Sequence, residues 1–276
     1  MVMGKMRDTG RMVVKDSKTG ETVEVGELPK KTFVDHPVAE MLPEDLRVMQ
    51  ALDRVLRLLS VGSKRFLTSK VDRSVTGLIA RQQCCGPLHL PLSDVAVLAQ
   101  SPFSTTGCAT AMGEPAGDCG VGVLRGDGRG DGGGGHSGKD SLWMAAKVGE
   151  EVVKAPGTLV VSVYAGCPDI SLTVTPDIKH AGRSSLVFVD LSGGHAWLGG
   201  SALAQTFQQL GDASPDCDTA LLKRAFRATQ RLLHERVLLA GHDRWNGGLL
   251  TRVLEMCFGG DCGCVMEATT EISVME

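Results

Sequence analysis

The sequence has few aromatic residues and no strong excess of charge of either sign. Aromatic side chains make up 4% of the 276 residues, so a core must be built mainly from Val, Leu, Ala and Met, which bury less area per residue. The net charge of −3 gives no long-range attraction for nucleic acid or for an anionic membrane surface. Any basic binding site must therefore be local.

Long apolar runs are also missing. No stretch approaches the roughly 20 apolar residues that a membrane-spanning helix needs, and no apolar segment follows Lys5 and Arg7 near the N-terminus. The nine cysteines are odd in number and lack the regular spacing of a secreted disulfide framework. We therefore expect a cytoplasmic protein with reduced thiols and with neither nucleic-acid nor membrane partners.

What the chain does contain is an alternation of strand and helix patterns, over a length that suits two domains of ordinary size. Residues 11–15 and 21–25 flank a glycine turn and predict a small hairpin. The other expected strands cover residues 94–99, 158–165, 170–175 and 185–191, the first two of them buried. Helical spacing predicts a helix that has Glu44 and Asp45 in its first turn and runs to about Ser60. Further helices are predicted over residues 201–210, 218–241 with Asp218 as the cap, and 246–258. This order predicts an α/β or α+β layered core.

Residues 117–138 are the most glycine-rich part of the chain. Such a composition cannot offset the entropy of ordering by burying apolar surface. A phosphate-binding loop has only a few placed glycines between a strand and a helix, so a flexible linker is favoured over that alternative.

Two acids are candidates for holding magnesium together with a nucleotide, since magnesium takes one or two carboxylates besides phosphate oxygens. Asp94 stands where a loop enters a strand, which would fix the direction of its carboxylate. Asp243 precedes a helix in a glycine-rich turn, where backbone N–H groups can approach a phosphate. The plainer alternatives are a solvent-facing acid for Asp94 and an ordinary glycine turn around Asp243.

Two lysines are candidates for a phosphate contact, because an ammonium is a compact point charge. Lys64 lies thirty positions before Asp94, and Lys139 follows a glycine and precedes Asp140 and Ser141. The plainer alternative is that each lysine side chain is simply exposed to water, as most lysines are. The turn at residues 198–201, before a helix, is a weaker candidate for an anion site.

Cys257, Cys262 and Cys264 form a Cys-x4-Cys-x-Cys cluster. A zinc site would need a fourth ligand and paired Cys-x2-Cys spacing, which are missing, so reduced and partly buried thiols are favoured. No Gly-x-Ser-x-Gly elbow is present to support a serine hydrolase.

Several motifs, taken in their order along the chain, resemble the second synthetase half of phosphoribosylformylglycinamidine synthase of the large single-chain type. The resemblance begins in residues 63–97 and covers roughly residues 42–114 and 138–266. Its motifs are residues 70–77 (KVDRSVTG), 138–141 (GKDS), 167–170 (CPDI), 198–205 (LGGSALAQ) and 242–244 (HDR).

The resemblance implies a role in purine biosynthesis. The family converts formylglycinamide ribonucleotide, glutamine and ATP to formylglycinamidine ribonucleotide, glutamate, ADP and phosphate. It also implies a truncated aminoimidazole ribonucleotide synthetase-like N-terminal domain followed by a partial C-terminal α/β domain. The expected division is a hairpin and linker over residues 1–41, an N-type domain over 42–179 interrupted by the linker at 117–138, and a C-type domain over 180–276.

In the family, the second half holds an auxiliary nucleotide with magnesium. Carried over by motif, Lys64 and Ser93 would contact the ATP or ADP, while Asp94 and Asp243 would bind the metal. Lys139 is a further expected nucleotide contact. No catalytic residue is expected in this chain.

Three departures from the family pattern predict a fragment that is inactive alone. A helical segment with Gly-Glu-Ala-Leu-Thr-Asn, which completes the family's magnesium site, is absent after residues 113–114, and the glycine-rich stretch stands in its place. Trp245 and Asn246 occupy positions where the family usually has Ser and Asp. The first synthetase half with its active-site histidine, the end of the last domain and the glutaminase domain are also absent.

A non-catalytic module that binds nucleotide and magnesium, or acts as a scaffold, is the alternative. A free-standing relative such as selenophosphate synthetase should show an N-terminal glycine-rich nucleophile loop, and this chain has none.

Overall fold

A computed structural model describes much of the chain in two compact units, Met1–Asp35 and His36–Glu276. The described residues are 3–6, 12–15, 22–25, 42–63, 65, 77–113, 145–154, 160–195, 197–209, 211, 213, 215–244 and 247–265. Lys64, Lys139, Trp245, Asn246 and the glycine-rich stretch at 117–138 lie outside them.

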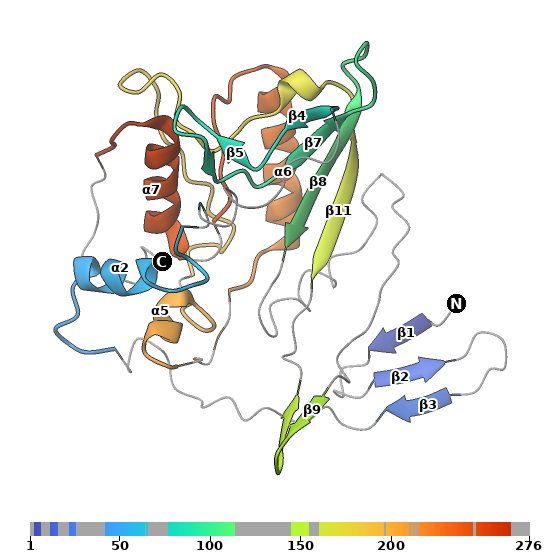
Figure 1. Ribbon diagram of the computed structural model, residues 1–276, viewed down its shortest axis with the longest axis vertical. Coiled ribbons are helices and arrows are strands. Elements are labelled where there is room, and N and C mark those ends of the chain that lie inside the picture. Colours follow the sequence, from blue (N-terminus) through green and yellow to red (C-terminus); the bar gives the residue numbers. More distant parts are fainter. Residues whose placement is uncertain are drawn as a thin grey trace. The chain divides into compact units, whose positions relative to one another are not determined.

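The first unit contains three antiparallel strands in the order β1-β2-β3 (Figure 1). They are β1 (Met3–Met6), β2 (Met12–Lys15) and β3 (Thr22–Val25). The pairing of β2 with β3 confirms the predicted hairpin. Strand β1, which was not predicted, extends the hairpin by pairing with β2.

The second unit contains a four-stranded antiparallel sheet in the order β11-β8-β7-β4. Strands β7 and β8 are joined tightly, since Gln100 donates its backbone N–H to Thr106 O at 2.9 Å. Asp94 lies two residues before β7, at the entrance to the sheet. The strands are β4 (Ile79–Arg81), β7 (Ala96–Ala99), β8 (Gly107–Gly113) and β11 (Val161–Cys167).

Two small hairpins complete the strands of this unit. The first pairs β5 (Cys84–Cys85) with β6 (Leu90–Pro91), and the second pairs β9 (Ala145–Val148) with β10 (Glu151–Lys154). Together with the main sheet and the helices they give a mixed α/β fold with antiparallel sheets.

The strand predictions over 94–99 and 158–165 correspond to β7 and β11, but their predicted burial is wrong. Only Val97 of β7 is buried, and β11 is largely exposed. The prediction over 170–175 is wrong, because Ile170–Leu172 forms the 3₁₀ turn η1, whose N-cap Asp169 accepts from the Ser171 N–H. No strand is described over 185–191, because an extended segment becomes a strand only where another strand pairs with it.

The four predicted helices are present. The first three are shorter than predicted, and the last begins and ends two residues later than predicted. Ser201 Oγ accepts from Ala204 N at the start of α5, and the Asp218 carboxylate accepts from two N–H groups at the start of α6, as predicted for that cap. The helices are α2 (Val48–Leu56), α5 (Ala202–Thr206), α6 (Thr219–His234) and α7 (Gly248–Gly260).

Two details of the helix predictions are wrong. Helix α2 begins only at Val48, so Glu44 and Asp45 precede its first turn. Helix α6 ends at His234 because Arg236 adopts a φ of 56°, and a left-handed residue cannot continue a right-handed helix.

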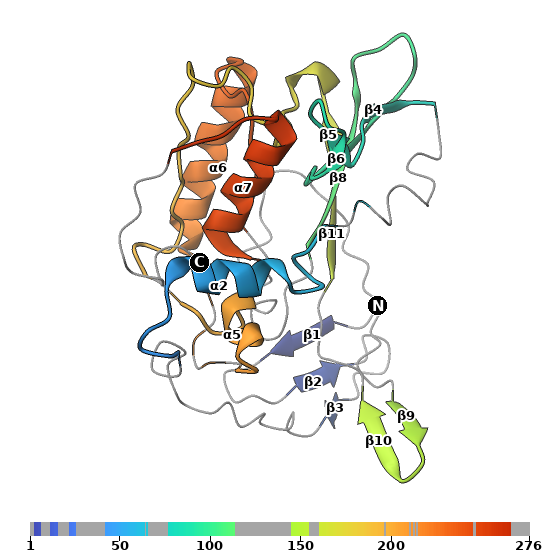
Figure 2. The ribbon, with the colours of Figure 1, turned by 60° about the vertical axis from the view of Figure 1, so that its left-hand side comes forward.

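The main apolar cluster joins α2 to α5, which lie side by side in both views (Figures 1 and 2). Ala51 and Val55 of α2 pack against Ala202 and Leu203 of α5. Only 1% of the surface of Leu203 is exposed to solvent. The half-buried residues around them are Leu42, Leu46, Leu58, Val61 and Phe207. Aliphatic and small side chains thus build this core, as the low aromatic content requires.

A close approach of two glycines sets α7 against the β5–β6 hairpin. Gly86 has a φ of 70°, and a Cβ atom there would lie 1.7 Å from the carbonyl oxygen of Gly259 on α7. A Cβ atom at Gly259 would itself lie 3.2 Å from the backbone of Asp177. Glycine is therefore required at this crossing, which places the helix that carries Arg252 and Glu255.

The crossing gives a stability prediction. Gly86→Ala should lower the free energy of unfolding by about 2–5 kcal/mol, combining the cost of a left-handed residue with that of the overlap. Gly182→Ala is the matched control, because Gly182 has a similar φ of 77° with no atom near its Cβ direction. This control substitution should lower the free energy of unfolding, measured by urea titration, by only about 1–2 kcal/mol. Equal losses in the two variants would show that the crossing is not tight.

Candidate metal and phosphate site

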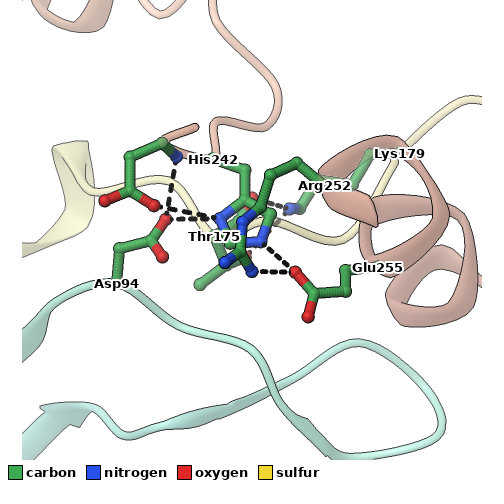
Figure 3. Close-up of polar contacts among 7 residues, drawn as sticks. Asp94, Thr175, Lys179, His242, Arg252 and Glu255 are labelled. Atoms are coloured by element: carbon green, nitrogen blue, oxygen red, sulfur yellow. Dashed lines mark hydrogen bonds and ion pairs between the residues drawn. The ribbon is translucent and has the colours of Figure 1, made fainter. Parts of the chain in front are cut away.

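Two distant parts of the chain bring three metal-ligating side chains together (Figure 3). His242 Nδ1 lies 2.8 Å from Asp94 Oδ2, and Asp243 donates its backbone N–H to the same oxygen at 3.3 Å, across 149 positions of sequence. One ligand atom from each of Asp94, His242 and Asp243 lies within 4.8 Å of the others. The loop that leads into β7 and the loop that leads into α7 therefore meet at this point.

Helix α7 holds the opposite side of the imidazole. His242 Nε2 lies 3.0 Å from Glu255 Oε2, and Arg252 forms an ion pair with that oxygen from one helical turn earlier (Figure 3). Exposure increases from the histidine outward: 2% of the His242 side chain is exposed, against 32% for Asp94 and 62% for Asp243. The carboxylates face solvent above a buried, charged base.

A neighbouring loop supports the segment before His242. Thr175 accepts the Gly241 backbone N–H through its carbonyl oxygen at 3.2 Å. Lys179 Nζ donates to Thr175 Oγ1 at 2.9 Å and pairs with Asp177 Oδ1 at 3.1 Å, and Thr175 and Lys179 are both labelled in Figure 3. The positive charge of Lys179 is therefore used to hold this loop.

The surroundings raise the pKa values of two groups, which favours the charged form of His242 and the neutral form of Asp243. Burial alone would lower the pKa of His242, but its hydrogen bonds to Asp94 and Glu255 outweigh burial and raise the pKa to about 9. The imidazole is therefore charged at neutral pH and donates from both ring nitrogens. Although 62% of the Asp243 side chain is exposed, desolvation of its carboxyl and the charge of Asp94 raise the pKa of Asp243 to about 6.

These residues fit a magnesium ion that carries a phosphate. Asp94 and Asp243 supply two hard carboxylate ligands, both partly exposed to solvent. Magnesium bound with a nucleotide usually takes one or two such carboxylates besides waters and phosphate oxygens. A divalent cation would also relieve the repulsion that raises the pKa of Asp243. The hydroxyl of Ser93, the residue before Asp94, is buried and has no hydrogen-bond partner in the described part of the chain.

The structure brings together two of the site residues expected from the sequence. Asp94 and Asp243 converge, whereas Ser93 only precedes Asp94 in the chain and has a buried hydroxyl. Lys64 and Lys139 lie outside the described residues, and their nucleotide contacts stay predictions. The sequence analysis named His242 only as part of a motif and missed its partner Glu255 and the ion pair of Glu255 with Arg252. The i, i+3 spacing of that pair was the one available signal, and by itself it indicates only a helix-surface ion pair.

Of the three cysteines in the cluster, Cys257 is buried. Burial and the neighbouring Cys264 raise the pKa of its thiol to about 12. The cysteines among the described residues all have free thiols, with Cys257 buried and Cys264 exposed.

The raised pKa of His242 predicts a pH-dependent stability. With a pKa of about 9 in the folded state against 6.5 in the unfolded chain, the favourable interaction is fully present below pH 6.5 and is lost as the pH rises through 9. The free energy of unfolding should fall by roughly 3 kcal/mol over this range. Urea unfolding in the presence of EDTA measures it.

His242→Gln is the control for this titration, because an amide does not ionise. The variant should be less stable at pH 6.5 and should lose most of the slope between pH 6.5 and 9. A wild-type chain whose stability is constant across that range would contradict the assigned bridge.

Comparison with known proteins supports a specific relationship. Residues 63–119, which include Ser93 and Asp94, match a family model described as the FGAR-AT PurM_N-like domain. The human phosphoribosylformylglycinamidine synthase is 45% identical over 301 residues, covering 87% of this chain and 22% of the relative. The Dictyostelium discoideum enzyme is 39% identical, covering 92% of this chain and 24% of the relative.

A third relative is described as a probable phosphoribosylformylglycinamidine synthase, chloroplastic/mitochondrial, from Arabidopsis thaliana, 41% identical over 91% of this chain and 22% of its own length. The human alignment spans more positions than the 276 residues of this chain, so the relative contains residues with no counterpart here. Among the described residues, no helix combines the length and apolarity needed to cross a membrane.

The chain spans about a quarter or less of the length of the relatives it matches. It is homologous, over that length, to phosphoribosylformylglycinamidine synthase of purine biosynthesis, and its residues 63–119 match the PurM_N-like domain model.

Proposed function

We propose that this chain forms part of the auxiliary nucleotide site of a phosphoribosylformylglycinamidine synthase. The convergence of Asp94 with Asp243 carries the proposal, since 149 positions of sequence separate two carboxylates that meet at one solvent-facing point. The homology supplies the chemical context, because the relatives are named for a synthase of purine biosynthesis.

In this proposal, Asp94 and Asp243 hold a magnesium ion, and Ser93 contacts the nucleotide beside it. The ion, when bound, neutralises the charge of the nucleotide phosphates. The unpaired hydroxyl of Ser93 supports its role, because a buried polar group without a partner is costly unless a ligand satisfies it. Lys64 and Lys139 are proposed as further contacts to the phosphates.

The reaction of the whole family is a proposal for the larger enzyme. ATP would activate the amide oxygen of formylglycinamide ribonucleotide so that glutamine-derived ammonia could replace it. We propose that this chain does not perform the reaction alone and that it carries a deletion where residues 117–138 stand. The human alignment, which is longer than the chain, supports the deletion.

The proposed domain organisation places an aminoimidazole ribonucleotide synthetase-like N-type domain at residues 42–179 and a partial C-type domain at 180–276. The matched residues 63–119 fall within the first of these. A cytoplasmic location stays a proposal, and the printed name of the Arabidopsis relative shows that organellar locations occur among similar proteins.

A second candidate is a non-catalytic module that binds nucleotide and magnesium. One observation favours it: contacts among Asp94, His242, Asp243 and Glu255, all present in this chain, hold the carboxylate pair together. A binding site can therefore persist without the synthase reaction.

Calorimetric titration of the purified chain with ADP and magnesium tests the site. Binding should be saturable, and Asp94→Asn should weaken it by about tenfold or more, or about 1.4 kcal/mol, through loss of a ligand charge. Asp53→Asn is the matched control, because Asp53 pairs with Arg57 on the exposed side of α2. It should leave the affinity unchanged.

Absence of heat at millimolar nucleotide would overturn the proposed site. The reaction is tested separately by supplying formylglycinamide ribonucleotide, ATP and ammonia. Product formation by this chain alone would contradict the proposal that it cannot catalyse the amidation unaided.

A further inference from the structure

We propose that His242 is a positioning residue that fixes the Asp94 carboxylate beside Asp243 and anchors it to helix α7 through Glu255. The inference rests on the proposed function, because it assumes that a divalent cation binds at Asp94 and Asp243. It adds that His242 holds the Asp94 carboxylate in the binding position before a cation is bound.

The imidazole is held at both ends. Nδ1 faces Asp94 Oδ2 at 2.8 Å and Nε2 faces Glu255 Oε2 at 3.0 Å, and each nitrogen must carry a hydrogen to bond a carboxylate (Figure 3). The side chain is buried, so water cannot replace either bond. Rotation of the ring would break both contacts at once, and the ring therefore has a single favourable orientation.

The far end of this bridge is itself fixed. Arg252 pairs with the same oxygen of Glu255 that faces the imidazole, so positive and negative groups alternate from Arg252 to Asp94. The helix that carries them is positioned by the close contact of Gly259 with Gly86. Residues on such a packed helix hold a partner more accurately than residues on a free loop.

The near end leaves one oxygen of Asp94 available. Oδ2 receives both His242 Nδ1 and the Asp243 N–H, whereas no hydrogen bond reaches Oδ1 from any residue that the structure describes. The positive imidazole also offsets the repulsion between Asp94 and Asp243 while no cation is bound. The bridge thus keeps a repelling pair together and turns one carboxylate oxygen toward the cation.

Two isosteric replacements separate positioning from general support. His242→Asn places an amide nitrogen near the Nδ1 position and keeps a donor to Asp94. His242→Gln places one near the Nε2 position and keeps a donor to Glu255. Both variants lose the same charge and retain an amide, so they differ mainly in which carboxylate is held.

The experiment measures Mn²⁺ binding to the full chain by the electron paramagnetic resonance signal of the free ion, and urea unfolding of the same samples. Manganese prefers the oxygen ligands that suit magnesium and avoids the thiols of this chain. Relative to wild type, His242→Asn should stay within about threefold in affinity, and His242→Gln should bind about tenfold more weakly or worse, a difference of about 1.4 kcal/mol. Both should lose similar unfolding free energy.

The outcomes distinguish this inference from the proposed function. If wild type binds Mn²⁺, Asp94→Asn does not, and His242→Gln binds as well as His242→Asn, the cation site stands and positioning by His242 is overturned. Positioning by His242 would also be overturned if the loss of Mn²⁺ affinity in the two variants simply paralleled their loss of unfolding free energy. If wild type does not bind Mn²⁺, both the cation site and the inference fail.

Discussion

The bridge that His242 makes between Asp94 and Glu255 is the interaction on which the candidate site depends. Asp94 and Asp243 repel each other when both are ionised, and the backbone N–H of Asp243 donates to Asp94 Oδ2 at 3.3 Å. A charged imidazole, buried and bonded at both nitrogens, offsets that repulsion and joins two separate loops. The sheet provides the loop before β7, and the packing of α7 provides the fixed carboxylate of Glu255.

The fold could be predicted from the sequence where local chemistry decides it. Ser201 and Asp218 cap helices because their side chains bond N–H groups two or three residues away, and the hairpin of β2 and β3 closes around a short turn. The errors at 170–175 and 185–191 have a different origin. A strand requires a partner that can lie far away in sequence, so an apolar segment alone does not determine whether it pairs.

The same limit applies to the site. Asp94 and Asp243 could be named from the sequence because each occupies a local position typical of a ligand, at a strand entrance and before a helix. Glu255 could not, because its partner His242 lies thirteen positions away and its spacing from Arg252 is typical of a surface pair. Burial of the histidine, a tertiary property, turns these residues into one network. Homology then connects that network to a synthase of purine biosynthesis.

The central claim is that Asp94 and Asp243 bind the cation that accompanies a nucleotide. Anomalous diffraction from crystals of this chain grown with MnCl₂ and ADP tests it most directly, because the ion is located without assuming its ligands. The account predicts a manganese peak within about 2.5 Å of a carboxylate oxygen from each of the two residues, with the ADP phosphates beside it. A peak elsewhere, with ordered ADP but no ion between these carboxylates, would contradict the claim.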